Sequence, residues 1–395
     1  MPTLPTVALL DWFHANRRDL PWRRQPEPYR VWLSEVMAQQ TRIDTMLAYY
    51  ALFLERWPTV QDLAAAPLAD VLAAWSGLGY YSRARNLHAA AQQAAKAGFP
   101  STAEGLRALP GVGDYTAAAI ASIAFGEDVA LVDGNVERVL CRFHALREDP
   151  RQPKVKRQIV ELAQRDLPAG QAGDYNQALM ELGALLCLPR GPRCGQCPLA
   201  TGCAARAEGL TEQLPNKPRI DKSKEIRGVC GALFAAGRVL MVRRPEGGLL
   251  GGLWELPGAD LPADATVESE PEALISALSE RLGLTVRCEA RAGFVRHIFT
   301  HRKLTLGVWT LSADHPRPEA RSLYPEHRWV SAHQLKDLGL STLARKALEL
   351  VGVSEQPLLF AAEAPASYAA KKAADSSQER PDKAPESPDS DSPSR

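Results

Sequence analysis

The sequence lacks several features that would assign a protein of 395 residues to a compartment or a partner. Lysine and arginine together number 47 and aspartate and glutamate 46, so no excess of one charge indicates a polyanionic or polycationic partner. The first residues lack the basic segment and the long apolar core of a signal peptide, and no apolar run reaches the ~18 residues that a membrane span needs. We therefore expect a cytoplasmic protein that does not associate with a membrane.

What the sequence contains is enough for more than one domain, because 45% of its residues are hydrophobic and a single core rarely grows past roughly 250 residues. Residues 5–205 carry Ala- and Leu-rich amphipathic stretches, which predict helices throughout. Later segments alternate as strands do and flank one helix over residues 271–282, which predicts an α+β unit. We assign four regions: an all-α domain over 1–206, a linker over 207–227, the α+β domain over 228–356 and a disordered tail over 357–395.

The cysteines are clustered. Four of the seven lie between positions 187 and 203, with proline and glycine residues that bend the chain between them. In a reducing compartment such a cluster indicates a metal site rather than a set of disulfides. Four thiolates can hold one zinc ion or an iron-sulfur cluster, and the physics of spacing alone does not choose between them. The four candidate ligands are Cys187, Cys194, Cys197 and Cys203.

Two segments place functional groups at the start of helices. A turn over residues 109–113, fixed by proline and containing Gly111 and Gly113, opens onto a helix near Tyr115. A phosphate could approach the free N–H groups of such a turn, which also serves as an ordinary connection between helices. Asp133 follows an apolar run and precedes a helical pattern, which predicts a helix cap. A carboxylate fixed there could also stabilise a sugar cation.

Glu35 is the lone acid in the helix predicted over residues 31–41, and its neighbours are apolar. Apolar surroundings disfavour the charged form of a carboxyl group and prepare it to donate a proton, although a helical glutamate is more commonly a solvated surface residue. Just before this helix, arginines that include Arg23 and Arg30 interleave with tryptophan and tyrosine residues. That pattern suits either phosphate contacts or a solvated basic face over a buried tryptophan.

Several segments together resemble the MutY family of the helix-hairpin-helix DNA glycosylase superfamily, which also includes endonuclease III. They are SEVMAQQT at 34–41, SGLGYYSRARNL at 76–87, LPGVG at 109–113, VDGNV at 132–136 and the cysteine loop. The resemblance covers essentially residues 8–205. It implies an adenine DNA glycosylase, and it implies that the four cysteines hold a 4Fe-4S cluster rather than zinc.

The resemblance also implies residue roles, position by position. Glu35 matches the family's proton donor to adenine and Asp133 its stabiliser of the oxocarbenium ion, with Asn135 and Tyr115 as their hydrogen-bonding partners. Excision needs such a pair of acids, because adenine leaves readily only when a ring nitrogen is protonated and the sugar left behind is cationic. The expected DNA contacts, in which Gln40 and Tyr80 enter the duplex beside the lesion, are Gln40, Thr41, Leu78, Tyr80, Leu109, Gly111, Val112, Gly113, Arg23 and Arg30.

Endonuclease III-like enzymes carry a lysine just after the hairpin, which attacks the sugar as a Schiff-base nucleophile. Tyr115 stands at that position, so we expect a monofunctional glycosylase. The alternatives are a lyase acting on oxidised pyrimidines, which Tyr115 disfavours, and a non-catalytic sensor of DNA damage, which the presence of both Glu35 and Asp133 disfavours. Glu137 stands where some relatives carry a basic residue, a departure that concerns a local DNA contact and not the reaction.

The segment GGLWELPG at 251–258 resembles the start of a Nudix domain. Alignment on Gly283 places the metal-binding glutamates of that family at Ala277, Glu280 and Arg281, so only one carboxylate remains. A divalent cation would lack ligands there, and a recognition domain without hydrolysis is expected.

In MutY enzymes this domain recognises 8-oxoguanine opposite adenine through a Phe-Ser-His loop. The corresponding residues are Phe299, Thr300 and His301, and threonine keeps the hydroxyl group while adding a methyl group. The substrate implied by the resemblance is double-stranded DNA that contains adenine opposite 8-oxoguanine or guanine, bound by a monomer.

Overall fold

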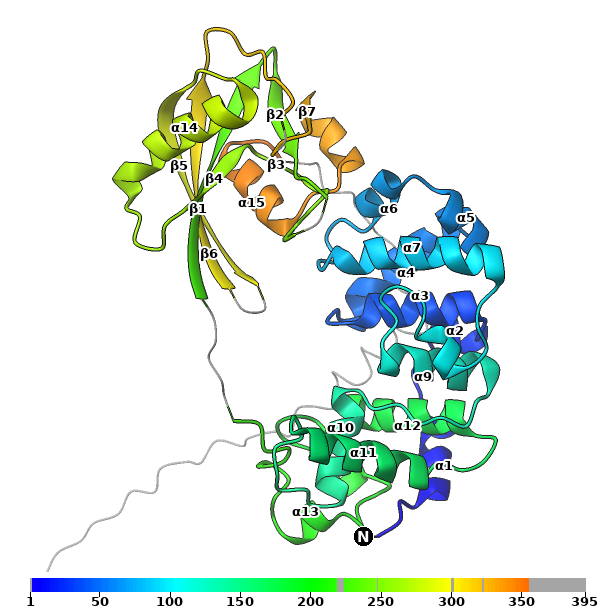
Figure 1. The fold of residues 1–395 in the computed structure, drawn as a ribbon. Helices are drawn as coiled ribbons and strands as arrows, with labels where there is room; N and C mark the ends of the chain where they lie inside the picture. The colour runs from blue at the N-terminus through cyan, green and yellow to red at the C-terminus, as the bar shows by residue number, and fades with distance from the viewer. Residues whose placement is uncertain (1, 219–223, 247, 300–301, 322, 355–395) are drawn as a thin grey trace, which may run out of the picture.

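The structure, a computed structural model, describes residues 2–218, 224–246, 248–299, 302–321 and 323–354. Figure 1 shows a helical domain formed by the first half of the chain and a second domain built on a sheet. This arrangement confirms the predicted fold class, an all-α domain followed by an α+β domain. No helix among the described segments combines the length and the apolar character required to cross a bilayer.

The first domain consists of helices joined by short turns. Proline stands in the first turn of three of them, where its missing N–H group removes no helical hydrogen bond. The helices are α1 (Thr6–Asn16), α2 (Pro21–Arg24), α3 (Pro28–Ala38), α4 (Ile43–Arg56), α5 (Val60–Ala65), α6 (Leu68–Ala74), α7 (Ser82–Ala97), α8 (Ala103–Leu106), α9 (Asp114–Phe125), α10 (Gly134–Phe143), α11 (Pro153–Arg165), α12 (Ala172–Leu185), the 3-10 turn η1 (Cys194–Gln196) and α13 (Ala204–Ala207).

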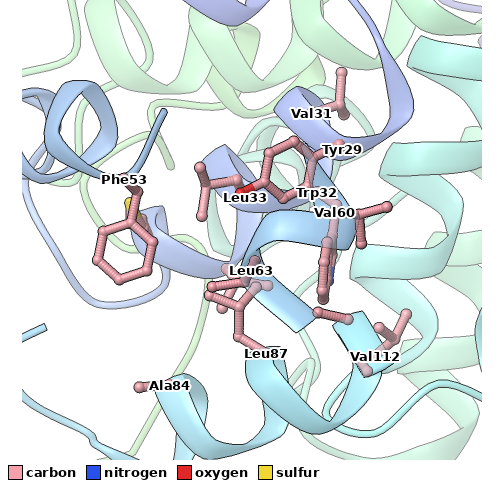
Figure 2. Packing of buried hydrophobic residues seen from close by; sticks show 14 of the residues in the cluster. Tyr29, Val31, Trp32, Leu33, Phe53, Val60, Leu63, Ala84, Leu87 and Val112 are labelled. Atoms are coloured by element: carbon pink, nitrogen blue, oxygen red, sulfur yellow. The ribbon is translucent and has the colours of Figure 1, made fainter. Parts of the chain in front are cut away.

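Two hydrophobic clusters form the core of this domain. In the first, Trp32 and Leu33 of α3 are completely buried and pack with residues of α4, α5 and α7, such as Phe53 (Figure 2). In the second, α1, α10, α11 and α12 pack around side chains that include Phe13 and Leu179. Helix α3 is therefore held inside the domain, which places its one acidic residue in apolar surroundings.

Helix α9 lies between the two clusters and contributes to both. Ala117 faces the first cluster, whereas Ala118 and Ala119 face the second. Because alanine side chains are short, α3 and α12 pack closely against α9 from their respective sides. The hairpin that precedes α9 thus leads directly into the centre of the domain.

The second domain contains a mixed sheet with the strand order β3-β2-β1-β6-β5, in which β1 pairs parallel with β6. Between β1 and β2, Ala236 and Gly237 both have positive φ angles, as a tight hairpin turn requires. The strands are β1 (Lys224–Ala235), β2 (Arg238–Arg243), β3 (Trp254–Glu255), β4 (Gly258–Leu261), β5 (Arg287–Phe299), β6 (Arg302–Ser312) and β7 (Glu326–Val330).

Helices cover both faces of this sheet. One face packs against α14 (Glu270–Leu282) through Leu274 and Leu278, and the other against α15 (Thr342–Leu350) through Ala344 and Ala347. Short 3-10 turns, η2 (Val267–Ser269) and η3 (Ala332–Asp337), precede these helices. Since both faces are covered, the strands β1 and β2 are largely apolar on each side.

Much of the segment expected to be a linker, 207–227, lies against the helical domain. Arg142 Nε donates a hydrogen bond to the carbonyl oxygen of Leu214 at 2.9 Å, and the Lys217 ammonium group pairs with Glu137 of α10 at 2.5 Å. Strand β1 begins at Lys224, inside the expected linker. The tail expected to be disordered, 357–395, lies outside the described residues.

Candidate active site

Glu35 lies on the buried helix α3 and is only 6% exposed. The hydroxyl group of Tyr115, from the first turn of α9, donates a hydrogen bond to Glu35 Oε2 at 2.5 Å. Burial raises the pKa of Glu35 to about 7, and the Tyr115 hydrogen bond opposes this shift. The carboxyl group can therefore carry a proton near neutral pH, which an ordinary surface glutamate cannot.

Asp133 caps α10, as the sequence predicts. Its Oδ1 accepts hydrogen bonds from the backbone N–H groups of Asn135 at 2.8 Å and Val136 at 2.7 Å, and its Oδ2 accepts one from Asn135 Nδ2 at 2.9 Å. Burial raises the pKa of Asp133 above its usual value, and the three donors, which favour the charged form, oppose this rise. Three hydrogen-bond donors thus favour the negative charge of Asp133, whereas the Glu35 carboxyl group has one donor and is more deeply buried.

The orientation of Asn135 is fixed by Arg138, a residue that the sequence analysis missed. Arg138 Nη2 donates to Asn135 Oδ1 at 2.9 Å and to the carbonyl oxygen of Gly183 at 2.7 Å. A Cβ atom on Gly183 would lie 2.6 Å from the Cβ atom of Asn135, so only glycine lets α12 approach the start of α10 this closely. The amide of Asn135 therefore points its nitrogen, and not its oxygen, at Asp133.

Glu35, Tyr115, Asp133 and Asn135 all line one cavity of about 660 Å³, which is a usual size for a ligand pocket. The two carboxyl groups come from different helices, α3 and the start of α10, and the negative charge of Asp133 adds to the rise in the pKa of Glu35. The cavity therefore brings together one acid with a pKa of about 7 and one whose negative charge is favoured by three hydrogen bonds.

The turn before α9 presents its backbone to solvent. The side chains of Leu109 and Val112 are buried, whereas Gly111 and Gly113 are exposed. Gly111 has a φ of 75°, and a Cβ atom there would lie 2.6 Å from the Cβ atom of Asn86, so this position requires glycine. An anion could reach the N–H groups at the start of α9 beside the exposed side chain of Asp114, which pairs with Arg107 at 3.2 Å.

Gln40 and Tyr80 are both exposed and both adopt the left-handed backbone conformation, with φ angles of 57° and 49°. Such angles are uncommon outside glycine and are maintained only by surrounding contacts. Arg83 supplies several of these contacts: its guanidinium group donates to the carbonyl oxygens of Val36, Met37, Leu78 and Gly79 and to Thr41 Oγ1. One buried cation thus ties the turn that carries Gln40 to the turn that carries Tyr80, while Leu78 itself is buried.

Comparisons with known proteins identify the domains and the family of this chain. Residues 33–165 match the HhH-GPD superfamily of base excision DNA repair proteins, and residues 229–350 match the NUDIX domain. The human adenine DNA glycosylase is 37% identical over 87% of this chain and 73% of its own length. This chain belongs to the adenine DNA glycosylase family. The Arabidopsis thaliana enzyme is 35% identical over 86% of this chain and 63% of its own length. The structure of a thermostable thymine-DNA glycosylase superimposes with a TM-score of 0.47 and 27% identity, over 51% of this chain and 95% of its own.

In this DNA glycosylase, the four clustered cysteines line a small apolar pocket of about 30 Å³ beside α10. Arg142 Nη1 lies 3.4 Å from Cys187 Sγ, so a cation is available to stabilise a thiolate. Among the described residues, no three metal-ligating side chains converge closely enough to hold a single metal ion. Four sulfur atoms with a neighbouring cation form a donor set that suits a thiolate-bound group, either a zinc ion or an iron-sulfur cluster.

Arg23 and Arg30 are placed differently from each other in the glycosylase. The guanidinium group of Arg23 pairs with Glu181 at 2.9 Å, and its side chain is only 10% exposed. Arg18 also pairs with Glu181, at 2.8 Å, and together the two arginines lower the pKa of Glu181 to about 2. This arrangement favours a structural role for Arg23, whereas Arg30 is more exposed and pairs with Glu27 at 3.3 Å.

The recognition loop expected in the Nudix-like domain is described only in part. Phe299 ends β5, is half-buried and packs its ring against that of His297, with centroids 4.5 Å apart. Thr300 and His301 lie outside the described residues. At the positions aligned with Nudix metal ligands, Ala277 is buried and Arg281 Nη1 donates to the carbonyl oxygen of Gly258 at 2.7 Å.

Proposed function

We propose that this adenine DNA glycosylase is monofunctional, acts as a monomer and removes adenine opposite 8-oxoguanine or guanine from double-stranded DNA. The observation that carries the proposal is the shared cavity in which Glu35, with a pKa of about 7, and the helix-capping Asp133 both lie. Two acids whose surroundings differ in this way can divide the roles of proton donor and anion between them.

Glu35 is the proposed proton donor. A protonated Glu35 transfers its proton to a ring nitrogen of the flipped adenine, and the electrons of the glycosidic C–N bond pass to the base as that bond breaks. The Tyr115 hydroxyl group holds the carboxyl group in place through the 2.5 Å hydrogen bond to Oε2. Because the site is buried, the neutral acid is available at the pH of the cell.

Asp133 is the proposed stabiliser of the oxocarbenium ion. Its three hydrogen bonds keep it charged and fix its position before the cation forms, so little reorganisation is needed at the transition state. Water then forms a bond to the anomeric carbon and loses a proton to the Glu35 carboxylate, which leaves an abasic sugar and restores the acid. Tyr115 offers no amine for a Schiff base, so the strand is not cut in the same reaction.

The DNA is held through its backbone at the turn of Gly111 and Gly113, whose exposed N–H groups and helix dipole suit a phosphate. Gln40 and Tyr80 enter the duplex and offset the cost of unstacking, which is roughly a few kcal/mol for one base. Thr41 supports this part of the site, since its hydroxyl group accepts a hydrogen bond from Arg83. Phe299, Thr300 and His301 recognise 8-oxoguanine on the opposite strand.

Cys187, Cys194, Cys197 and Cys203 hold a 4Fe-4S cluster. When bound, the cluster would supply a redox-active centre and tie together the segment between α12 and α13. Within this chain, Arg138 links the loop to the active site, because its Nε donates to the carbonyl oxygen of Cys187 at 2.7 Å while its Nη2 orients Asn135.

A glycosylase assay on duplexes with adenine opposite 8-oxoguanine, guanine and thymine tests the proposal, with Glu35→Gln run beside the wild type. We expect excision opposite 8-oxoguanine and guanine, and an abasic product that breaks only after alkali. Efficient strand cleavage without alkali would show a lyase, and no excision by the wild type would favour a damage sensor.

A further inference from the structure

The two domains meet through polar contacts at the turn between α6 and α7. Ser76 Oγ donates a hydrogen bond to the carbonyl oxygen of Leu340 at 2.8 Å, and the Tyr81 hydroxyl group donates to the same oxygen at 2.6 Å. Arg345 Nη2, from α15, donates to Ser76 Oγ at 2.7 Å. We call this group, formed by Ser76, Tyr81, Leu340 and Arg345, the interdomain contact.

The interdomain contact includes residues from the hydrophobic cores of both domains. Tyr81 is 4% exposed and belongs to the first hydrophobic cluster of the helical domain, and Leu340 is fully buried and belongs to a cluster of the C-terminal domain. Burial also raises the pKa of Tyr81, so its hydroxyl group stays a hydrogen-bond donor. Buried polar groups that pair across a boundary fix the relative position of the two sides.

On one side, the contact holds the turn that carries Leu78 and Tyr80. That turn has an unusual backbone, with positive φ at Gly77, Gly79 and Tyr80. Its shape depends on hydrogen bonds at its ends, including those of Ser76 and, at the carbonyl oxygens of Leu78 and Gly79, of Arg83. The exposed Tyr80 is thus positioned by what holds the turn rather than by burial of its own ring.

On the other side, α15 connects the contact to the strand that ends in Phe299. Ala344 and Ala347 of α15 share a hydrophobic cluster with Val295 of β5, and Phe299 packs against that cluster. Figure 1 shows α15 between the sheet of the second domain and the helical domain. Arg345 therefore reaches Ser76 from a helix that also packs on the strand leading into the recognition loop.

We propose that Ser76, Tyr81 and Arg345 are specificity-determining positioning residues, which couple recognition of the base opposite adenine to the placement of Tyr80. This inference rests on the proposed function, because it names the contacts through which recognition of 8-oxoguanine would affect excision. A change in the C-terminal domain on binding 8-oxoguanine shifts α15 and, through the interdomain contact, the turn of Tyr80. Arg83 extends the path to α3, since it also binds the carbonyl oxygens of Val36 and Met37 beside Glu35.

The double variant Ser76→Ala/Tyr81→Phe tests the inference, because it removes two hydroxyl groups and leaves the apolar packing in place. Tyr29→Phe is the matched control, since the Tyr29 hydroxyl group donates to the carbonyl oxygen of Trp57 at 2.8 Å inside the helical domain. We expect the ratio of single-turnover rates for adenine opposite 8-oxoguanine over adenine opposite guanine to fall about 3- to 30-fold in the double variant, the range seen when a coupling contact is lost. The control keeps the wild-type ratio.

A second readout reports the turn itself. With 2-aminopurine beside the 8-oxoguanine, fluorescence rises when a side chain unstacks the neighbouring base, and we expect a smaller rise with the double variant than with Tyr29→Phe. We expect Arg345→Met to lower the ratio and the signal, and Arg345→Lys to restore part of both. If the wild type excises adenine and the variants equal the control in ratio and fluorescence, this inference alone is overturned. If the wild type shows no excision, the inference and the proposed function are both overturned.

Discussion

The Tyr115 hydroxyl group donates a hydrogen bond to Glu35 Oε2 at 2.5 Å and so joins the helix after the hairpin to the helix that carries the acid. Tyr115 lies two residues after Gly113 of the hairpin. One side chain therefore connects the hairpin, the proposed phosphate site, to the proposed proton donor in the cavity. The hairpin and the placement of Glu35 depend on the same helix, α9.

The Tyr115 hydrogen bond predicts the pH dependence of excision. Excision needs protonated Glu35, so kcat/KM should fall as pH rises through about 7. The hydrogen bond lowers the pKa of Glu35, and Tyr115→Phe should therefore move this fall to higher pH. A pH profile of single-turnover rates checks this, and a profile that moves to lower pH would contradict the assignment of Glu35 as the acid.

Glu35 is predicted to destabilise the folded protein at alkaline pH. Its folded pKa of about 7 lies above the unfolded value of 4.5, so the folded state binds more protons between these values and stability falls as pH rises through that window. Glu35→Gln should raise the free energy of unfolding at pH 8.5 by about 2–4 kcal/mol and leave it nearly unchanged at pH 4, while excision falls by about 10²- to 10⁴-fold. Urea unfolding at both pH values measures the first effect, and equal effects at the two pH values would refute the prediction.

The buried group of Glu181 with Arg18 and Arg23 should stabilise the fold. Glu181→Gln removes the buried negative charge that Arg18 and Arg23 share, and it should cost about 3–5 kcal/mol at pH 7. The pKa of Glu181 is lowered from 4.5 to about 2, so its contribution is present above pH 4.5 and is lost as pH falls toward 2. Asp19→Asn is the control, because the exposed pair of Asp19 and Arg24 should contribute nothing measurable to denaturant unfolding.

Substitution of one cluster ligand should remove the visible colour of the protein. Purified wild type should be yellow-brown from thiolate-to-iron charge transfer, and Cys197→Ser should lose most of this absorption. Cys288→Ser, in the second domain and outside the loop, should keep it. A colourless wild type that contains zinc by metal analysis would contradict the iron-sulfur cluster.

Substitutions in the recognition loop should change the preference between substrates more than the rate of excision itself. Phe299→Ala/Thr300→Ala should lower the preference for adenine opposite 8-oxoguanine over adenine opposite guanine, with excision opposite guanine largely retained. Val267→Ala, which changes a partly exposed side chain in η2, serves as the control. An unchanged preference in competition assays would remove this loop from the proposed recognition site.

Local pattern was enough to predict much of the candidate site. The apolar neighbours of Glu35 and the capping position of Asp133 are properties of short segments, and the structure places both on the helices expected from them. Glu181, Arg138 and Arg83 could not be found in this way, because each also bonds to residues distant in sequence, as Arg138 does to Gly183 and Arg83 to Val36. Glu181 lies 158 residues from Arg23, so only the packing of α12 against the N-terminal helices brings their charges together.

Arg23 illustrates the same limit, since its pairing with Glu181 could not be foreseen and its predicted DNA contact stays a prediction. An arginine among tryptophans reads the same in sequence whether it faces DNA or a buried carboxylate. The interdomain contact was likewise absent from the sequence analysis, since Ser76 and Leu340 are 264 residues apart and neither residue type indicates an interface. The contacts of these residues are set by tertiary packing and not by the local sequence.

The short side chains of α9 have a consequence for the spacing of the two acids. Ala117 of this helix faces the cluster that includes α3, and Ala118 and Ala119 face the cluster that includes α10, so α9 acts as a spacer between the elements bearing Glu35 and Asp133. A bulkier residue at any of these alanines would cost about 1–3 kcal/mol in overpacking and would push the carboxyl groups apart. The distance between the two carboxyl groups thus depends on alanine methyl groups that lie outside the cavity.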